Sequence, residues 1–290
     1  EVSDLVLANN REQTLAVSLD EARSRESLDE FNALIASFER EKLLDRASSG
    51  IPSREELTER ASEGVGLTRP TLAVLLSYAK LHSYAQLLDS PLPDEPVVAD
   101  YLVRYFPTEV KEAVGEEGLA SHRLRREIIA TNLASDLINL MGASFLYRVA
   151  RDSGREISEV VWAWDIASRM AGAREIREDL TALEGKFPSQ TIYRWLFALA
   201  RVLDRTTRWV INNAEAGSST ATVLNAHLPG LSRLRGDFRK IVSGEHRQIF
   251  RNRMEELQEL GVEEQLAARL ITLRFLPELL DIVRIAGEAN

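Results

Sequence analysis

The chain carries at residues 66–80 the run GLTRPTLAVLLSYAK, in which apolar residues recur with the period of an α-helix. Thr68 is well suited to cap this helix, and Pro70 falls in the first turn, where its missing N–H costs no hydrogen bond. One face of the helix is predicted to be buried: Leu72, Leu75, Leu76 and Ala79. The run therefore predicts a capped helix that packs one side into a core.

The same helical period extends along almost the whole chain. Ser27-x-x-Glu30 and Ser53-x-x-Glu56 both have the pattern of a capping box, in which the serine and glutamate side chains bond N–H groups at a helix start. A long helix is predicted from about Ser189. One face of that helix carries Trp195, Leu199, Val202, Thr206 and Trp209. We interpret this stripe as a core face and not an aromatic site, because helix packing requires such a stripe.

The chain lacks the signals of β-structure. No run alternates apolar and polar residues as a strand does, and no Asn-Gly or Asp-Gly hairpin turn occurs. We expect an all-α fold, either a multi-helix domain or an array of helical subdomains, with little or no β-sheet.

Proline and glycine indicate where such an array divides. The run DSPLPDEP at residues 89–96 has three prolines in six residues, which favours an extended or flexible linker. A second break, Ala216-Gly217-Ser218-Ser219, follows the long helix. We therefore expect three helical subdomains, at residues 1–90, 91–216 and 217–290.

The last of these subdomains has its own interruptions. Pro229 is expected to interrupt it, and Gly261 to separate its final helices. Residues 282–290 resemble residues 146–154, but the chain stops where the earlier copy continues into another helix. We therefore expect this subdomain to be truncated. The absence of an initiator Met also suggests an excised fragment.

Composition narrows the class of protein. The chain has 290 residues, of which 44% are hydrophobic and 28% charged, as is ordinary for a globular protein. Its net charge of -9 argues against a nucleic-acid partner, whose binding surface is basic. No apolar run approaches the roughly 18 residues that span a bilayer, so no membrane partner is expected. The absence of cysteine and of a signal peptide fits a cytoplasmic protein.

No residue pattern indicates a catalytic, cofactor or metal site. Gly64-Val65-Gly66 lacks the third glycine of a dinucleotide fingerprint and lies between predicted helices. The histidines, at positions 82, 122, 227 and 246, are never spaced to pair on one helix turn. We therefore predict no catalytic residue, no cofactor-binding residue and no metal ligand in this chain.

A polar row does stand out among apolar residues. Arg125 is followed by Asn132, Asp136 and Asn139 at spacings that place all four on one helical face. Such a row must be hydrogen-bonded if it is buried. Three interpretations remain open: bonds to neighbouring helices, contact with another domain or subunit, and binding of an anion or ligand.

Residues 66–80, quoted above, are followed further along the chain by residues 122–131, HRLRREIIAT. Together, in this order, the two segments resemble the C-terminal helical region of the large bacterial NAD-specific glutamate dehydrogenases. Weaker similarities run from the first helix to residues 280–283. Ser135 and Leu140 depart from the Asn and Arg more usual in the family.

This resemblance implies a function that the residues alone do not. In that family, the catalytic and nucleotide-binding parts precede this region, and the parent enzyme oxidises L-glutamate to 2-oxoglutarate and ammonia with NAD. The expected partners are the catalytic domain of the same polypeptide and further copies of the parent in a homo-oligomer. The chain itself is expected to be a structural and assembly region without bound NAD. The alternative is an independent all-α protein-interaction scaffold.

The candidate site combines the polar row with polar residues of the two segments that carry the resemblance. Its members form either an interface or a structural polar network: Thr68, Arg69, His122, Arg125, Arg126, Asn132, Asp136 and Asn139.

Overall fold

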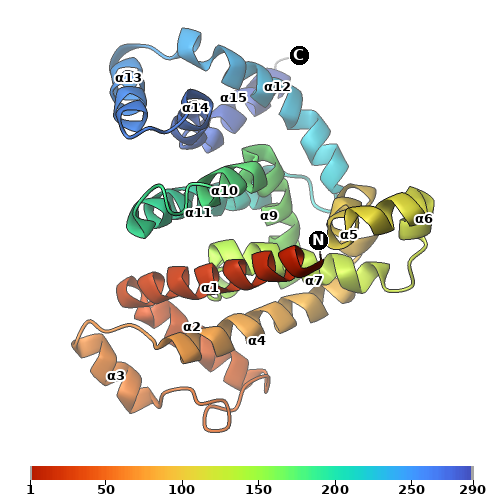
Figure 1. The fold of residues 1–290 in the computed structure, drawn as a ribbon, viewed down its shortest axis with the longest axis vertical. Coiled ribbons are helices and arrows are strands. Elements are labelled where there is room, and N and C mark those ends of the chain that lie inside the picture. The colour runs from red at the N-terminus through yellow and green to blue at the C-terminus, as the bar shows by residue number, and fades with distance from the viewer. Residues whose placement is uncertain (1, 289–290) are drawn as a thin grey trace. The chain divides into compact units, whose positions relative to one another are not determined.

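The computed structural model describes residues 2–288 and confirms the all-α prediction (Figure 1). Within those residues there is no β-strand, only an isolated bridge between Glu184 and Phe187. The chain divides between Val161 and Trp162 into two compact units. Whether the three subdomains expected from the sequence are separate folding units stays a prediction.

The first unit contains eight α-helices and two short 3-10 helices among the described residues. Their bounds are α1 (Val2–Glu26), α2 (Leu28–Arg40), α3 (Arg54–Ser62), α4 (Arg69–Leu88), η1 (Leu92–Asp94), η2 (Pro96–Val98), α5 (Ala99–Tyr105), α6 (Thr108–Ala120), α7 (Arg125–Met141) and α8 (Phe145–Ser153). Helix α9 (Ile157–Ala171) begins in this unit and ends in the next. Gly115 breaks the helical geometry inside α6, with φ at 70°.

The core of the first unit lies where α1, α4 and α7 pack together (Figure 1). Their facing side chains are fully buried, among them Leu72, Leu75, Leu133 and Leu137. Thr68 caps α4 by accepting a hydrogen bond from the Thr71 N–H, and Pro70 lies in the first turn, as predicted. The apolar period of residues 66–80 therefore does bury one face of α4.

Two capping predictions had different outcomes. Ser53 and Glu56 form the predicted capping box, with both reciprocal hydrogen bonds present. Ser27 begins α2 but makes no side-chain cap, so that prediction was wrong. The Glu30 N–H bonds the Ser27 carbonyl at 3.1 Å instead of the Ser27 hydroxyl. The Glu30 carboxylate lies at the start of α8, where it accepts from Ser144 Oγ at 3.3 Å and lies 3.4 Å from Arg148 Nε.

The proline-rich segment also differs from its prediction. Residues 92–98 form the two 3-10 helices and are not an extended linker. Leu92, Pro93 and Val98 are buried, and η1 packs on both α4 and α7. Proline forbids an α-helix here but allows a short 3-10 turn, whose apolar side chains enter the core.

The second unit is also helical. Its elements are α10 (Ala173–Thr181), α11 (Ser189–Asn213), α12 (Thr220–Ile241), α13 (Gly244–Glu259), α14 (Glu264–Leu273) and α15 (Leu276–Glu288). Helix α11 packs against α10, α14 and α15. Its predicted core face is buried at Leu199, Val202, Thr206 and Trp209, while Trp195 is half-buried.

Helix α12 contains Pro229, which was expected to interrupt it. The helix instead continues through the proline. The next residue, Gly230, lies so close to α15 that an added Cβ would be 2.9 Å from Val283 Cγ1. Helix α12 thus stays continuous despite the lost N–H donor of Pro229, at a point where it packs closely on α15. Gly261, with φ at 85°, separates α13 from α14 as predicted.

No single helix in residues 2–288 is long and apolar enough to cross a membrane. Helices α7 and α8 reach the required length and composition only together, and they are bent by 92° at their junction. Ile129, Leu137 and Phe145 of this pair are fully buried within the first unit.

Candidate functional site

The first two candidate residues connect α4 to α1. Thr68 Oγ1 and Thr71 Oγ1 lie 2.9 Å apart, which completes the cap of α4. Arg69 Nη1 donates to Ser18 Oγ and to Glu21 Oε2, both at 3.0 Å. These contacts fix the start of α4 against the second half of α1.

Gly66 allows the segment before α4 to approach α1 closely. A Cβ at this position would lie 2.4 Å from Ser24 Oγ and 2.9 Å from the backbone nitrogen of Arg25. The same Ser24 hydroxyl accepts a hydrogen bond from the Leu67 N–H at 3.0 Å. Only glycine allows this approach without a shift of the backbone.

His122 lies in the turn before α7. Its Nδ1 accepts a hydrogen bond from the Leu124 N–H at 3.1 Å, and its ring contacts Phe106 with centroids 5.4 Å apart. In the neutral ring, this acceptor role leaves the proton on Nε2. His122 therefore stabilises the turn that leads into α7.

Arg125 and Arg126 are the first two residues of α7. Both donate hydrogen bonds to the proline-rich segment. Arg125 Nη1 donates to the Pro93 carbonyl at 3.0 Å. Arg126 Nη2 donates to the carbonyls of Leu88 and Ser90, at 2.8 and 3.0 Å, and Arg126 Nη1 pairs with Asp94. Because α4 ends at Leu88, Arg126 supplies a donor to a carbonyl of the last helical residue, and it also bonds the Ser90 carbonyl just beyond the helix.

The middle of the polar row faces α5. Asn132 Nδ2 donates to the Ile128 carbonyl at 3.0 Å and reaches the Tyr101 carbonyl at 3.5 Å. Asp136 Oδ2 accepts from Arg104 Nη1 at 3.2 Å, and the Arg104 guanidinium lies 4.4 Å from the centroid of the Tyr101 ring. Arg125 and Asp136 thus find partners on different elements, as their separation along α7 requires.

Asn139 is the last residue of the row and the most buried, at 6% exposure. Its Oδ1 is buried and has no hydrogen-bond partner among the described residues. A buried unsatisfied carbonyl costs about 1–3 kcal/mol. The row is therefore satisfied at Arg125, Asn132 and Asp136 but not at the Asn139 oxygen, and its assignment as an interface stays a prediction.

Sequence reasoning missed a fully buried charged group of the first unit. Asp20 of α1 is fully buried, accepts the Ala143 N–H at 3.0 Å and pairs with Arg23 Nη1 at 2.8 Å. Arg23 Nη2 in turn donates to the Leu140 carbonyl at 2.6 Å. We call Asp20, Arg23 and Gly142 the α1–α7 clasp, because they join α1 to the junction of α7 and α8.

Gly142 is required by both backbone and space in the α1–α7 clasp. Its φ is 86°, and an added Cβ would lie 2.3 Å from Asp20 Oδ1. The available sequence signal was weak, since Asp20 and Arg23 have the ordinary spacing of a helical ion pair and Gly142 the ordinary position after a helix.

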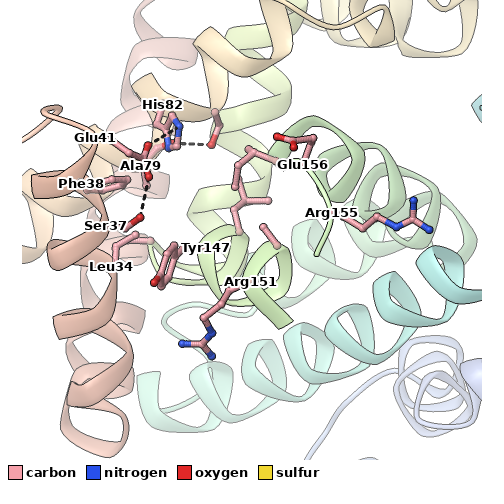
Figure 2. Close-up of a pocket in the computed structure, with 15 residues that line it drawn as sticks. Leu34, Ser37, Phe38, Glu41, Ala79, His82, Tyr147, Arg151, Arg155 and Glu156 are labelled. Carbon is pink, nitrogen blue, oxygen red and sulfur yellow. Dashed lines mark hydrogen bonds and ion pairs between the residues drawn. The ribbon is translucent and has the colours of Figure 1, made fainter. Parts of the chain in front are cut away.

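A pocket of about 220 Å³ lies between α2, α4, α8 and the start of α9 (Figure 2). Glu41 accepts from Ser37 Oγ at 2.8 Å and lies 3.3 Å from His82 Nε2, while the His82 ring meets Phe38 edge-on. In Figure 2 the Glu156 carboxylate reaches the pocket from the side opposite Glu41. This volume is below the roughly 300–1,000 Å³ of usual small-molecule sites.

The arrangement of these polar groups joins helices and does not converge on one reacting atom. In the part of the chain that the structure describes, no group of three or more His, Cys, Asp or Glu side chains is placed to hold a metal ion. Each satisfied member of the polar row is bonded to another helix, to a backbone carbonyl or to both. The geometry supports mechanical connection between α1, α4, α5 and α7.

The chain is similar to known proteins of one family. The family model described as "Glutamate dehydrogenase, C-terminal" matches residues 64–290. The chain is 34% identical over 290 residues to an NAD-specific glutamate dehydrogenase of Halomonas elongata, covering 100% of this chain and 18% of that protein. For the proteins of the same name in Pseudomonas aeruginosa and Mycobacterium tuberculosis, identity is 32% and 30%, with 97% and 98% of this chain and 17% of each relative covered.

The chain therefore spans less than a fifth of the length of these relatives. The family match confirms the resemblance found in residues 66–80 and 122–131, and it includes every residue of the candidate site. The chain belongs to the glutamate dehydrogenase family and corresponds to that family's C-terminal region.

Proposed function

We propose that this chain is the structural and assembly region of an NAD-dependent glutamate dehydrogenase and supplies no catalytic group. The parent reaction is the oxidation of L-glutamate to 2-oxoglutarate and ammonia with reduction of NAD, as part of amino-acid catabolism in the cytoplasm. The observation that supports this proposal best is coverage, since the whole chain aligns with only 18% of its Halomonas relative. The remaining length of such a protein has ample room for the catalytic and NAD-binding parts.

The polar contacts of the first unit support a mechanical role. Arg69 and Arg126 lie in the two segments that resemble the family, and Asp136 lies further along α7. All three are engaged with other helices of the same unit. Groups held in this way position helices, whereas a catalytic group must be accessible to a substrate. We therefore propose that the candidate residues hold α4, α5 and α7 in fixed positions within the first unit.

The proposed partner is the rest of the same polypeptide, and one exposed surface suits it. The first turns of α1 expose Val2, Leu5, Val6 and Leu7, at 42–64% of their surface. We call these four residues the α1 apolar turns. Exposed apolar clusters of this kind mark contact surfaces. A parent more than five times the length of this chain supplies the covering surface, and the assembled parent is proposed to be a homo-oligomer.

The test uses the full-length parent with two sets of changes. Leu5→Ser combined with Val6→Ser alters the α1 apolar turns, and Leu81→Ser, at a leucine of α4 that is 63% exposed, is the control. We expect the double variant to lower the fraction of assembled enzyme in sedimentation velocity while glutamate turnover per assembled enzyme stays unchanged. The control should change neither quantity.

Deletion of the whole region separates the proposal from the alternative of an independent scaffold. If the region supports the enzyme, a parent lacking it should lose assembly or stability and, with them, activity. A parent that keeps full assembly and turnover after the deletion would instead favour an interaction scaffold for other proteins.

A further inference from the structure

The pocket in Figure 2 lies between α2, α4, α8 and the start of α9, and the described residues that line it all belong to the first unit. Aliphatic side chains form much of its wall, among them Leu34, Leu146 and Ile157. An apolar cavity of about 150 Å³ is enough for benzene. A pocket of about 220 Å³ therefore has room for a small molecule of about six to nine non-hydrogen atoms.

Two carboxylates reach this pocket from opposite sides, those of Glu41 and Glu156 (Figure 2). Glu41 accepts from Ser37 Oγ at 2.8 Å and lies 3.3 Å from His82 Nε2, so its position is fixed from two helices. Among the residues that the structure describes, the Glu156 carboxylate has neither a hydrogen bond nor an ion pair. Since an ionised carboxylate has about four acceptor sites, both groups can accept further hydrogen bonds.

Two arginines also line the pocket, but their charges are directed elsewhere. Arg151 pairs with Asp152 at 2.8 Å, and Arg155 pairs with Glu159 at 3.3 Å. Both of these acidic partners lie outside the pocket lining. In Figure 2 the two guanidinium groups point away from the pocket. The pocket therefore combines an apolar wall with negative charge and hydrogen-bond acceptors.

An aliphatic amine has the complementary chemistry. Its ammonium group carries a positive charge and N–H donors, and hydrogen bonds between oppositely charged groups are the strong ones. Its alkyl chain gains free energy when it leaves water for an apolar wall. An anion would be repelled by the two carboxylates, and a neutral molecule would leave their charge uncompensated.

We propose that this pocket binds a small aliphatic amine, whose ammonium group donates to Glu156 and to Glu41. Ser37 and His82 position the Glu41 carboxylate for this contact. Because Glu156 immediately precedes α9, a bound amine connects the start of that helix to the end of α2. The site is independent of the proposed assembly role, since it involves neither the α1 apolar turns nor the polar row of α7.

Titration of butane-1,4-diamine into the chain, at constant ionic strength, tests the site. The alanine methyl groups are labelled with ¹³C and observed by NMR, because Ala79, Ala143 and Ala150 line the pocket. Their signals should shift saturably with a Kd of about 1 mM or lower, as is reasonable for so small a ligand. Butane-1,4-diol, which has the same length and no charge, should give no saturable shift over the same range.

Three variants locate the binding and its cause. Glu156→Gln removes one charge without changing the size of an exposed side chain, and it should raise the Kd about tenfold or more. Glu117→Gln, at an exposed carboxylate of α6, should leave the Kd unchanged. Ala150→Leu fills the pocket from the half-buried face of α8 and should abolish the shift. Should this last variant not fold, Glu156→Gln decides alone.

The proposal is overturned by any of three results. The first is the absence of a saturable shift up to about 10 mM diamine, where a ligand of this size with a matched site must bind. The second is binding of the diol as tightly as the diamine, which would leave no role for the carboxylates. The third is an unchanged Kd in Glu156→Gln.

Discussion

The two ends of α7 are held by different means. At its start, the half-buried Arg125 and Arg126 donate to backbone carbonyls of the 88–94 segment. At its end, the fully buried Asp20 accepts the Ala143 N–H and pairs with Arg23, which donates to the Leu140 carbonyl. The first end is thus fixed by cations that water still reaches, and the second by a carboxylate that water does not.

This difference determines what each contact contributes to stability. An exposed ion pair is worth about 0–1 kcal/mol, because water and salt screen it. Removal of one partner from a buried pair costs about 3–5 kcal/mol, because the other charge is left buried and uncompensated. The α1–α7 clasp should therefore matter more to folding than the arginines that make residues 122–131 typical of the family.

The largest effect is expected at the α1–α7 clasp. Asp20→Ala should lower the free energy of unfolding of the chain by about 3–5 kcal/mol, since it removes the carboxylate partner of Arg23 and leaves the Ala143 N–H unpaired. Urea unfolding followed by circular dichroism measures this change. Glu26→Ala, at an exposed position near the end of the same helix, is the control and should stay within about 0.5 kcal/mol of the parent. Similar losses for both variants would show that the burial of Asp20 does not govern its contribution.

A smaller effect is expected at the start of α7. Arg126→Met should cost about 1–2 kcal/mol, because it removes charged donors from the Leu88 and Ser90 carbonyls while leaving those carbonyls partly accessible to water. Limited proteolysis should also cut residues 89–96 faster in this variant. Arg123→Met, on an exposed side chain of the preceding turn, should change neither measurement. Unchanged proteolysis in Arg126→Met would mean that the 3-10 segment is held by Leu92 and Val98 alone.

A substitution in the middle of α7 should lower the stability of the chain less than either of the changes above. Asp136→Ala breaks the pair with Arg104, whose side chains are 23% and 35% exposed, so we expect a loss of about 1 kcal/mol. Glu117→Ala, at an exposed carboxylate of α6, should lose less than Asp136→Ala in the same urea experiment. If the two variants are equal, the polar row contributes nothing to the stability of the chain, and an assembly role for Asp136 gains support.

The ion pair of Arg46 provides a pH-dependent reference for these effects. Arg46 donates to both Glu39 oxygens at 2.9 Å, and these hydrogen bonds hold the pKa of Glu39 below its ordinary value of 4.5. Because the folded pKa is lowered, the stabilisation is present above pH 4.5 and is lost as the pH falls through the folded pKa. The stability difference between the chain and Arg46→Met should therefore shrink on acidification. A difference that stays constant with pH would attribute the effect of Arg46 to its bond with the Pro52 carbonyl at 2.6 Å.

Local signals in the sequence predicted much of the fold. The Thr68 cap, the Ser53 capping box and the buried face of α11 depend on residues within a few turns, where helical periodicity is informative. The predicted Ser27 box does not form, and the Glu30 carboxylate instead contacts Ser144, 114 residues along the chain. Local patterns could not reveal that contact.

The candidate site was predictable to the same extent. The polar row on α7 was visible because charged residues interrupt an apolar helix. The α1–α7 clasp was not, because Asp20 and the Ala143 N–H are 123 residues apart and meet only in the folded chain. The compact 3-10 structure of residues 92–98 was likewise hidden, since three prolines exclude an α-helix without saying what replaces it.

The proposed role, a structural region that supplies no catalytic group, is tested most directly by one titration. Calorimetric titration of NAD into the chain, with glutamate turnover assayed on the same sample, should give no heat beyond dilution and no NADH. The polar row of α7 is bonded to neighbouring elements, and the pocket lined by α2, α4 and α8, at about 220 Å³, is smaller than usual ligand sites. A micromolar Kd for NAD, or measurable formation of NADH, would contradict the claim and place part of the active site within these residues.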